Sequence, residues 1–187
     1  MLNSIISHID TKLSDSGFII NPKGLAEFKY IDSDKKIPAT FCNGEWTAID
    51  IESEFTYHRI NGTISFDELD EEQATSCDPW LRATFPIKYV FCQKKTTLDN
   101  SIYDASKVAF QLSMLLQTLN NKTLAIELGV DTFSVLVENS DTDVYAVYDS
   151  EFNTSEYPED YVLISIDYNI ELTGTYNCID KICQNVQ

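Results

Sequence analysis

The sequence predicts an α+β domain: a mostly antiparallel sheet with an N-terminal helix and a second helix packed on one face. Three patterns predict this class. The chain opens with an apolar stripe at helical spacing, continues with two Asn-Gly pairs between short alternating segments, and later has two long alternating segments. We expect a single domain over residues 1–174, with a hairpin and loop insertion around 43–79 and a C-terminal tail over 175–187.

Residues 2–13 have the spacing of an amphipathic helix, which Gly17 can end. The other side of this helix is polar, so we expect it to dock on the sheet through one side only. The apolar side of the helix consists of Leu2, Ile5, Ile6, Ile9 and Leu13. After the helix, short strands are expected over residues 18–20 and 28–31.

Two Asn-Gly pairs, at residues 43–44 and 61–62, predict tight hairpins. A type I′ turn requires positive φ at both central residues, and Asn-Gly meets that requirement better than most pairs. The flanking strands are residues 37–42 and 45–51 for the first pair, and residues 54–60 and 63–69 for the second. Two consecutive hairpins would commit this third of the chain to antiparallel sheet.

Residues 67–79 are acidic and have the composition of a loop. We interpret the segment as a solvated loop, because like charges repel one another and stay hydrated. The alternative is a functional acidic loop that projects from an assembly. Its carboxylates are Asp67, Glu68, Asp70, Glu71 and Glu72.

The centre of the chain, residues 80–119, combines a long strand with the strongest helical pattern in the sequence. Residues 81–91 are apolar at every second position, as in a half-buried strand. Pro86 cannot donate to a ladder, which predicts a sheet edge or a bulge near it. Ser101 is the expected N-cap of a helix that runs to Leu119. We expect this helix to lie on the sheet, with the preceding strand as its partner.

After this helix, residues 124–128 are expected to form a short strand. Residues 133–137 and 144–148 are then expected to form a hairpin. The polar tip of that hairpin includes Asp141 and Asp143.

The last strand, residues 162–172, has the clearest alternation in the chain. Apolar residues occupy every even position, and polar residues occupy most of the odd ones. We expect a half-buried strand whose polar face is exposed or paired with another chain. Ser165, Asp167 and Asn169 lie on that face and are the candidate subunit interface.

The composition argues against two classes of partner. The chain has 30 acidic and 13 basic residues and a formal net charge of −17, so attraction to a nucleic-acid backbone or an anionic membrane is disfavoured. No apolar run approaches the ~20 residues of a membrane helix. Five cysteines without an N-terminal apolar leader indicate a cytosolic protein with reduced thiols.

The sequence contains no catalytic or metal-binding motif. His8 and His58 have no Cys-x-x-Cys partner, and Cys178 and Cys183, the closest cysteine pair, are interpreted as unpaired thiols. Gly-rich phosphate loops and Gly-x-Ser-x-Gly elbows are missing as well. We therefore expect no catalytic residues, no metal and no cofactor. An enzyme that uses scattered carboxylates is the least favoured alternative.

The order of elements also carries a resemblance. The helix over residues 2–13 is followed by a strand that starts Ile37-Pro38-Ala39, and a long strand then starts Trp80-Leu-Arg-Ala-Thr-Phe-Pro-Ile and leads into a helix. The chain closes on an alternating strand after an acidic turn at Asp160. Over most of residues 1–173, this order resembles the tail terminator and tail-completion proteins of tailed bacteriophages, small α+β proteins that form rings at the head–tail junction.

The resemblance implies a structural subunit of a phage neck or tail, made in the host cytoplasm and located in the virion. Its copies would form a homo-oligomeric ring, six- or twelve-fold, between the connector or portal-side proteins and the tail tube. DNA would pass through the lumen without specific binding, because acidic residues lower adhesion to a polyanion. The candidates for projecting or lumen-facing acidic loops are Asp67, Glu68, Asp70, Glu71, Glu72, Asp141 and Asp143.

A second class of function shares the charge and the lack of catalytic motifs. It is an acidic monomeric binding module, such as an inhibitor or immunity protein that mimics nucleic acid against a basic target. That class predicts a monomer with its acid concentrated on one convex face, whereas a ring protein predicts a defined oligomer.

Overall fold

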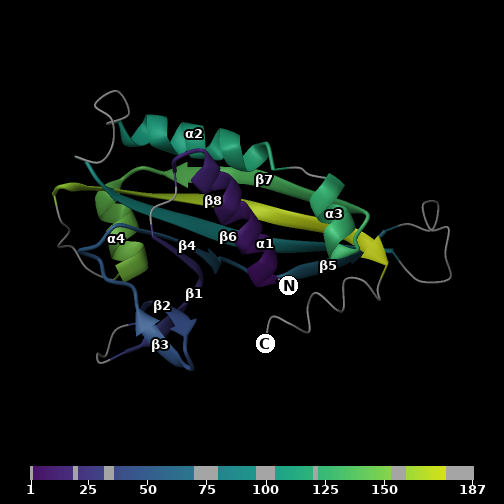
Figure 1. Ribbon diagram of the computed structural model, residues 1–187, viewed down its shortest axis with the longest axis horizontal. Helices are drawn as coiled ribbons and strands as arrows, with labels where there is room; N and C mark the ends of the chain where they lie inside the picture. The colour runs from purple at the N-terminus through teal and green to yellow at the C-terminus, as the bar shows by residue number, and fades with distance from the viewer. Residues whose placement is uncertain are drawn as a thin grey trace.

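The computed structural model describes residues 2–18, 21–31, 36–69, 80–95, 104–119, 122–152 and 159–175. These residues form a mostly antiparallel eight-stranded sheet with four helices, which confirms the α+β class (Figure 1). The strand order is β3-β2-β1-β4-β6-β8-β7, and β5 pairs with β6 beside this path. The elements are α1 (Leu2–Asp15), β1 (Pro22–Tyr30), β2 (Lys36–Cys42), β3 (Glu45–Ala48), β4 (Phe55–Ile60), β5 (Ser65–Glu68), β6 (Trp80–Lys94), α2 (Ala105–Gln117), α3 (Lys122–Leu128), β7 (Thr132–Asp141), α4 (Val144–Phe152) and β8 (Tyr161–Thr175).

The two longest strands, β6 and β8, form the centre of the sheet. They are antiparallel and pair over all 15 residues of each, from Trp80 opposite Thr175 to Lys94 opposite Tyr161. Both long strands predicted from alternation are confirmed. β8 is longer than the predicted residues 162–172 and continues through Gly174 to Thr175.

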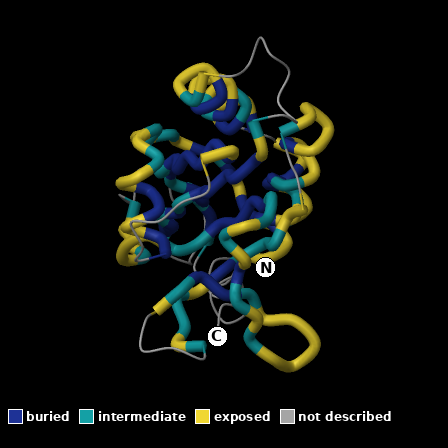
Figure 2. The backbone as a smooth tube through the Cα atoms, turned by 90° about the vertical axis from the view of Figure 1, so that its left-hand side faces the viewer, coloured by how far each residue is buried: buried dark blue, intermediate teal, exposed yellow. Residues whose placement is uncertain are grey.

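The larger core lies on one face of the sheet, beneath α1, α2 and α3, and a smaller core lies on the other face beneath α4. The larger core takes the odd positions 81–91 of β6 and the even positions 162–172 of β8. The smaller core takes Val90 and Cys92 from β6 and Tyr161 and Leu163 from β8. Figure 2 shows the buried backbone running through the middle of the molecule, with exposed segments around it. α1 and α2 share a face, as predicted, and α4 covers part of the other.

α1 has the predicted amphipathic form. Its five apolar side chains at positions 2, 5, 6, 9 and 13 are each at most 1% exposed, and burying each one stabilises the fold by about 1.5–3 kcal/mol. The helix ends at Asp15, and Gly17 adopts a φ of 78° that favours glycine in the turn after a helix.

α2 begins later than predicted. Asp104 is its N-cap, and the Asp104 carboxylate accepts a hydrogen bond from the backbone N–H of Ser106 at 2.9 Å. The predicted cap, Ser101, lies outside the described residues. Serine and aspartate are comparable N-caps, so composition alone does not choose between them. α2 packs across β7 and β8 and not on β6, the strand before it, which corrects the predicted partner.

The hairpin predicted at Asn61-Gly62 is wrong. β4 pairs with residues 87–92 of β6, and β5 pairs with residues 81–84 along the same edge. At Pro86, the partner of β6 along this edge changes from β4 to β5. The Pro86 carbonyl accepts a hydrogen bond from the backbone N–H of Asn61 at 2.8 Å. Because Pro86 has no N–H to leave unpaired, the interruption costs little at this position. Gly62 lets the chain pass, since a Cβ there would lie 3.0 Å from the Pro86 ring.

Two segments predicted as strands are helical. Residues 124–128 belong to α3, and residues 144–148 belong to α4, so the predicted hairpin after β7 is also wrong. β7 pairs with β8 instead. Asp143 caps α4 by accepting hydrogen bonds from the backbone N–H groups of Tyr145 and Ala146 at 3.0 and 3.3 Å. The buried side chains of α4 recur at helical spacing: Val147, Tyr148, Glu151 and Phe152.

β1 links the body of the sheet to a smaller three-stranded sheet. Pro22 and Leu25 pair in parallel with β4, whereas residues 26–30 pair antiparallel with β2. One strand therefore replaces the two short strands predicted at 18–20 and 28–31. Of those ranges, residues 19 and 20 lie outside the described part of the chain.

We call residues 26–30, 36–42 and 45–48 the arm. The Asn43-Gly44 hairpin predicted for it is confirmed, with φ values of 53° and 88° at the two turn residues. Figure 1 shows β2 and β3 standing away from the body of the sheet, on the side opposite α2.

Candidate functional site

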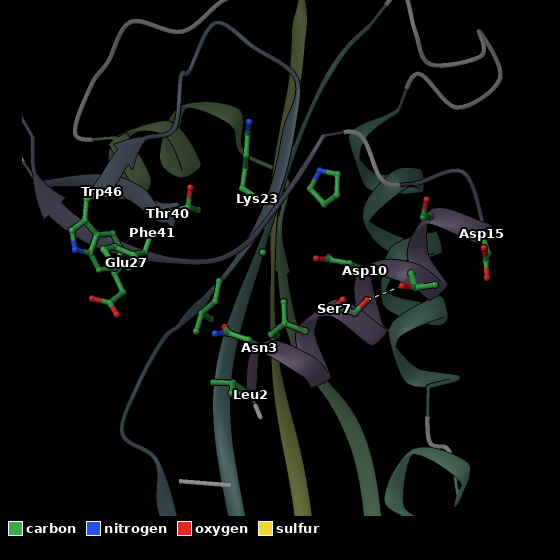
Figure 3. A pocket seen from close by; sticks show the side chains of 16 residues that line it. Leu2, Asn3, Ser7, Asp10, Asp15, Lys23, Glu27, Thr40, Phe41 and Trp46 are labelled. Atoms are coloured by element: carbon green, nitrogen blue, oxygen red, sulfur yellow. Dashed lines mark hydrogen bonds between the residues drawn. The ribbon is translucent and has the colours of Figure 1, made fainter. Parts of the chain in front are cut away.

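An open groove of about 1000 Å³ lies between α1 and the arm (Figure 3). We call it the arm groove. Leu25 contributes apolar surface to its lining beside Leu2 and Ile6, which are almost fully buried, and Phe41 and Trp46 form its aromatic wall. The groove exists because β1 leaves the body at Leu25 and carries β2 and β3 away from α1.

The aromatic wall follows from the hairpin register. Phe41 and Trp46 are directly opposite each other across β2 and β3, so both project from the same face of the arm. Their ring centroids are 5.3 Å apart, and the Lys29 ammonium lies 4.1 Å from the Trp46 ring centroid. Phe41 nevertheless remains 61% exposed. Burying an exposed phenylalanine side chain stabilises a fold or a complex by about 1.5–3 kcal/mol, so a partner that covered Phe41 would bind more tightly.

The charged lining of the arm groove is mainly acidic. Asp10 and Asp15 come from α1, Glu27 comes from β1, and Lys23 is the one cation among the described lining residues. Glu27 is paired with Lys29 at 2.6 Å. Asp15, at the end of α1, has no ion-pair partner among the described residues. The groove therefore favours a cationic group on whatever occupies it.

Beneath α1, a buried polar network ties the helix to the sheet. His58, which is 0% exposed, places Nε2 at 2.9 Å from the Asp10 carboxylate and Nδ1 at 2.8 Å from the Tyr168 hydroxyl. A carboxylate only accepts, so Nε2 carries the hydrogen of the first bond. Burial, and then the nearby charge of Asp10, raises the pKa of Tyr168 well above its ordinary value.

A second buried network lies on the opposite face of β4, because alternate residues of a strand point to opposite faces. Tyr57 donates its hydroxyl hydrogen to the fully buried carboxylate of Glu151 at 2.8 Å, and Arg59 donates to both oxygens of that carboxylate at 2.8 and 2.7 Å. Burial tends to lower the pKa of Arg59, but the hydrogen bond and charge of Glu151 raise it. Burial, followed by the charge of Glu151, raises the pKa of Tyr57. The network anchors α4 to the sheet.

The predicted interface residues lie on the α4 side of β8. Ser165 is 2% exposed, so it offers almost no surface in the single chain. The Asp167 side chain is 28% exposed and accepts a hydrogen bond from the amide of Asn61 at 2.8 Å. Asn169 donates to the Glu138 carboxylate at 2.6 Å. Their role as a subunit interface stays a prediction.

The described residues of the predicted acidic loops lie in or beside regular elements and not in projecting loops. Asp67 and Glu68 are exposed residues of β5 that pair with β6, because the backbone there continues the ladder. Asp141 ends β7 and accepts a hydrogen bond from the backbone N–H of Asp143 at 2.9 Å, so these two residues start a helix and not a hairpin tip. The remaining members of the set, Asp70, Glu71 and Glu72, lie outside the described residues.

No group of three or more His, Cys, Asp or Glu side chains in the described ranges could hold a metal ion. Cys42 is exposed, and Cys92 is buried. Burial raises the pKa of the Cys92 thiol to about 12, which keeps it protonated near neutral pH. Cys178 and Cys183 lie outside the described residues. Among the described helices, none has the length and apolar content that a membrane span requires.

Sequence reasoning missed three features of this site. It placed His58 in a strand but did not identify Asp10 as its partner, and it did not identify Glu151 as a buried charge. The helical spacing of Val147, Tyr148 and Glu151 was the available signal for the second feature. For the arm groove there was no local signal, because its walls come from residues about 40 positions apart that only the folded chain brings together. No family model matches the chain, and no curated protein matches it.

Proposed function

We propose that this protein is a structural subunit that assembles head to tail into a closed ring in the neck or tail of a tailed bacteriophage. The support is the order of elements described above, together with one structural observation: the opposite ends of the sheet carry different exposed apolar surfaces. A ring of identical copies needs such a pair, because each copy must offer one patch to the neighbour on one side and another patch to the neighbour on the other.

The two surfaces lie at opposite ends of the strand order. At the β3 end, the arm exposes Phe41, which is 61% accessible. At the β7 end, α2 packs on the sheet and turns Phe110 and Met114 outward, at 66% and 48% exposure. Figure 1 shows α2 and the arm on opposite sides of the molecule. The β3 and β7 strands also have one unpaired edge each among the described strands, which suits lateral association.

The net charge of −17 is compatible with a lumen that passes DNA. Acidic residues around a channel repel phosphate groups and so reduce adhesion of the DNA to the wall. The same charge makes neighbouring copies repel one another. The contacts between copies must then be apolar or charge-paired, and salt should strengthen assembly by screening the repulsion.

The test is the mass of the purified chain in solution as a function of salt, with negative-stain images of any assembly. A single chain has a mass of 21.3 kDa. We expect a discrete oligomer that becomes more populated between low and physiological ionic strength, alone or with purified connector or tail-tube proteins. A chain that remains monomeric in all of these mixtures contradicts the proposal.

The net charge also favours a second candidate, an acidic monomeric module that binds a basic target. Its binding would weaken with salt, because attraction between opposite charges is screened. Tight binding of a basic protein by a monomer at low salt only would therefore favour the second candidate over the ring.

A further inference from the structure

We propose that the outer side of α2 in one copy docks in the arm groove of the next copy. This inference rests on the proposed ring and specifies which two surfaces of neighbouring copies meet.

The outer side of α2 is a short amphipathic recognition surface. Lys107, Phe110 and Met114 follow one another at spacings of three and four residues, so they lie along one side of the helix. The opposite side is used in the core, where Val108, Ala109, Leu112 and Leu116 are buried. Phe110 and Met114 are large apolar side chains with about half or more of their surface in water. A folded chain gains nothing from that exposure, so this apolar surface is available to a second copy.

The arm groove complements this surface in its apolar part. Phe41 and Trp46 form an aromatic wall, and their rings are tilted by 57° to each other. An aromatic ring such as Phe110 packs favourably on that arrangement, and a thioether such as Met114 makes favourable contacts with aromatic rings. The volume of about 1000 Å³ accommodates the side chains of one side of a short helix.

The charges complement each other as well. The groove has three carboxylates and one lysine among its described lining residues, and Asp15 has no ion-pair partner there. The outer side of α2 carries the opposite sign in Lys107, which is exposed and follows the N-cap by three residues. We therefore place Lys107 of one copy against Asp15 of the next. Because the chain is strongly acidic, such a contact also relieves some of the repulsion between copies.

The placement of the two surfaces makes the contact head to tail. α2 and the arm lie on opposite sides of one molecule (Figure 1), so a chain cannot dock its own helix in its own groove. Each copy gives one helix and receives one helix, and the contact repeats until the ring closes. Figure 3 shows the groove between α1 and the aromatic wall of Phe41 and Trp46.

The test uses two variants, each of which removes one surface. Phe110→Asp removes the helix surface, and Phe41→Asp removes the groove surface. Each variant alone should be monomeric under conditions where the wild type assembles. An equimolar mixture should form a heterodimer of twice the single-chain mass and nothing larger, because each variant keeps one intact surface. Mass photometry or light scattering measures this, and circular dichroism checks that both variants fold.

Matched controls use exposed residues away from both surfaces. Ile126→Asp changes an exposed apolar residue of α3, and Tyr30→Asp changes an arm residue whose side chain points away from the groove. Both should assemble like the wild type. Lys107→Glu should weaken assembly at least tenfold in concentration, and combining it with Asp15→Lys should restore it.

Each outcome supports or overturns the inference. Assembly of both Phe variants at wild-type strength overturns the docking of α2 in the arm groove and leaves the proposed ring intact. Loss of assembly in both variants, with no heterodimer in the mixture, shows that the two surfaces do not meet each other. A wild-type chain that stays monomeric with all candidate partners overturns the ring and, with it, this contact.

Discussion

Three consecutive residues of β4 serve two different buried networks, and the comparison shows how each face of the sheet holds its helices. His58 points toward α1, where it meets Asp10 and Tyr168. Tyr57 and Arg59 point toward α4, where both meet Glu151. One strand thus anchors a helix on each of its faces.

The two networks differ in how much apolar burial surrounds them. The network under α1 lies within the larger core, which also holds α2 and most of the apolar side chains of β6 and β8. The network under α4 lies beside a smaller core, and it contains a fully buried carboxylate paired with an arginine. α1 and α2 are therefore held mainly by apolar contacts, which are non-directional. α4 depends more on the buried Glu151 carboxylate and its hydrogen bonds to Arg59, which are directional and costly to break.

The largest effect is expected in the apolar core beneath α2. Leu112→Asp places an unpaired charge at a position that is 0% exposed, which costs several kcal/mol against a total stability of about 5–15 kcal/mol. Leu112→Asp should therefore unfold the domain or prevent its expression in folded form. Gln111→Asp, at the neighbouring exposed position, should change the free energy of unfolding by less than about 0.5 kcal/mol. Urea denaturation distinguishes the two, and a reversed result would show that the helical phase of α2 is wrong.

The next effect is expected from breaking the charge pair under α4. Arg59→Met removes the cation that is hydrogen-bonded to both oxygens of the buried Glu151 carboxylate and leaves only the Lys88 ammonium at 3.7 Å, so it should lower the free energy of unfolding by about 3–5 kcal/mol. The double variant Arg59→Met with Glu151→Leu should recover most of that loss, because apolar replacement of both partners removes the unpaired charge. If the single and double variants were equally destabilised, the pair would not be the main anchor of α4.

Alkaline pH should lower the stability of the fold through tyrosines buried on both faces of the sheet. Burial raises the pKa values of Tyr57, Tyr89, Tyr148 and Tyr168 above the ordinary value of 10.0. The folded state therefore keeps protons that the unfolded state releases above pH 10. Stability is fully present below about pH 10 and falls as the pH rises further, by up to about 1.4 kcal/mol per tyrosine for each pH unit.

Thermal unfolding from pH 8 to pH 11 measures this dependence. Tyr57→Phe and Tyr168→Phe should each make the alkaline loss shallower, and comparing them separates the contributions of the two faces. A melting temperature that stays flat above pH 10 in the wild type would contradict the assigned burial of these hydroxyl groups.

A smaller effect is expected at the network under α1. Asp10→Ala leaves the buried Nε2–H of His58 without an acceptor and should lower the free energy of unfolding by about 1–3 kcal/mol. Asp15→Ala, on the same helix but exposed, should have little effect. Chemical denaturation of the two variants measures the difference, and equal values would mean that the His58 bond contributes no net stability.

The smallest effect on the single chain is expected at Asp167. Its side chain is 28% exposed, and its contacts are one hydrogen bond to Asn61 and a Lys88 ammonium at 3.8 Å. Asp167→Lys should therefore cost about 1 kcal/mol or less in monomer stability. The variant also separates two possible interfaces. If Asp167→Lys abolishes assembly while Phe110→Asp does not, the subunits meet through the α4 side of β8 and not through the arm groove.

The sequence by itself determined the features that depend on local periodicity. The apolar face of α1, the long alternating strands β6 and β8, and the Asn43-Gly44 hairpin were all predicted, because each is specified by residues within one element. The two Asn-Gly pairs also show the limit of local signals. The first forms a hairpin, whereas at the second the flanking strands both pair with β6, because a long neighbouring strand offered more hydrogen bonds than a short hairpin.

Only the tertiary structure decided the features that depend on distant residues. α4 and α3 were mistaken for strands, since segments of seven to nine residues carry too few repeats to separate the two periodicities. The Glu151–Arg59 pair joins residues 92 positions apart, and the His58–Tyr168 bond spans 110 positions. The arm groove likewise exists because β1 changes partners at Leu25. A sequence pattern encodes which side of an element is buried, but the partner on that side is chosen by packing across the whole chain.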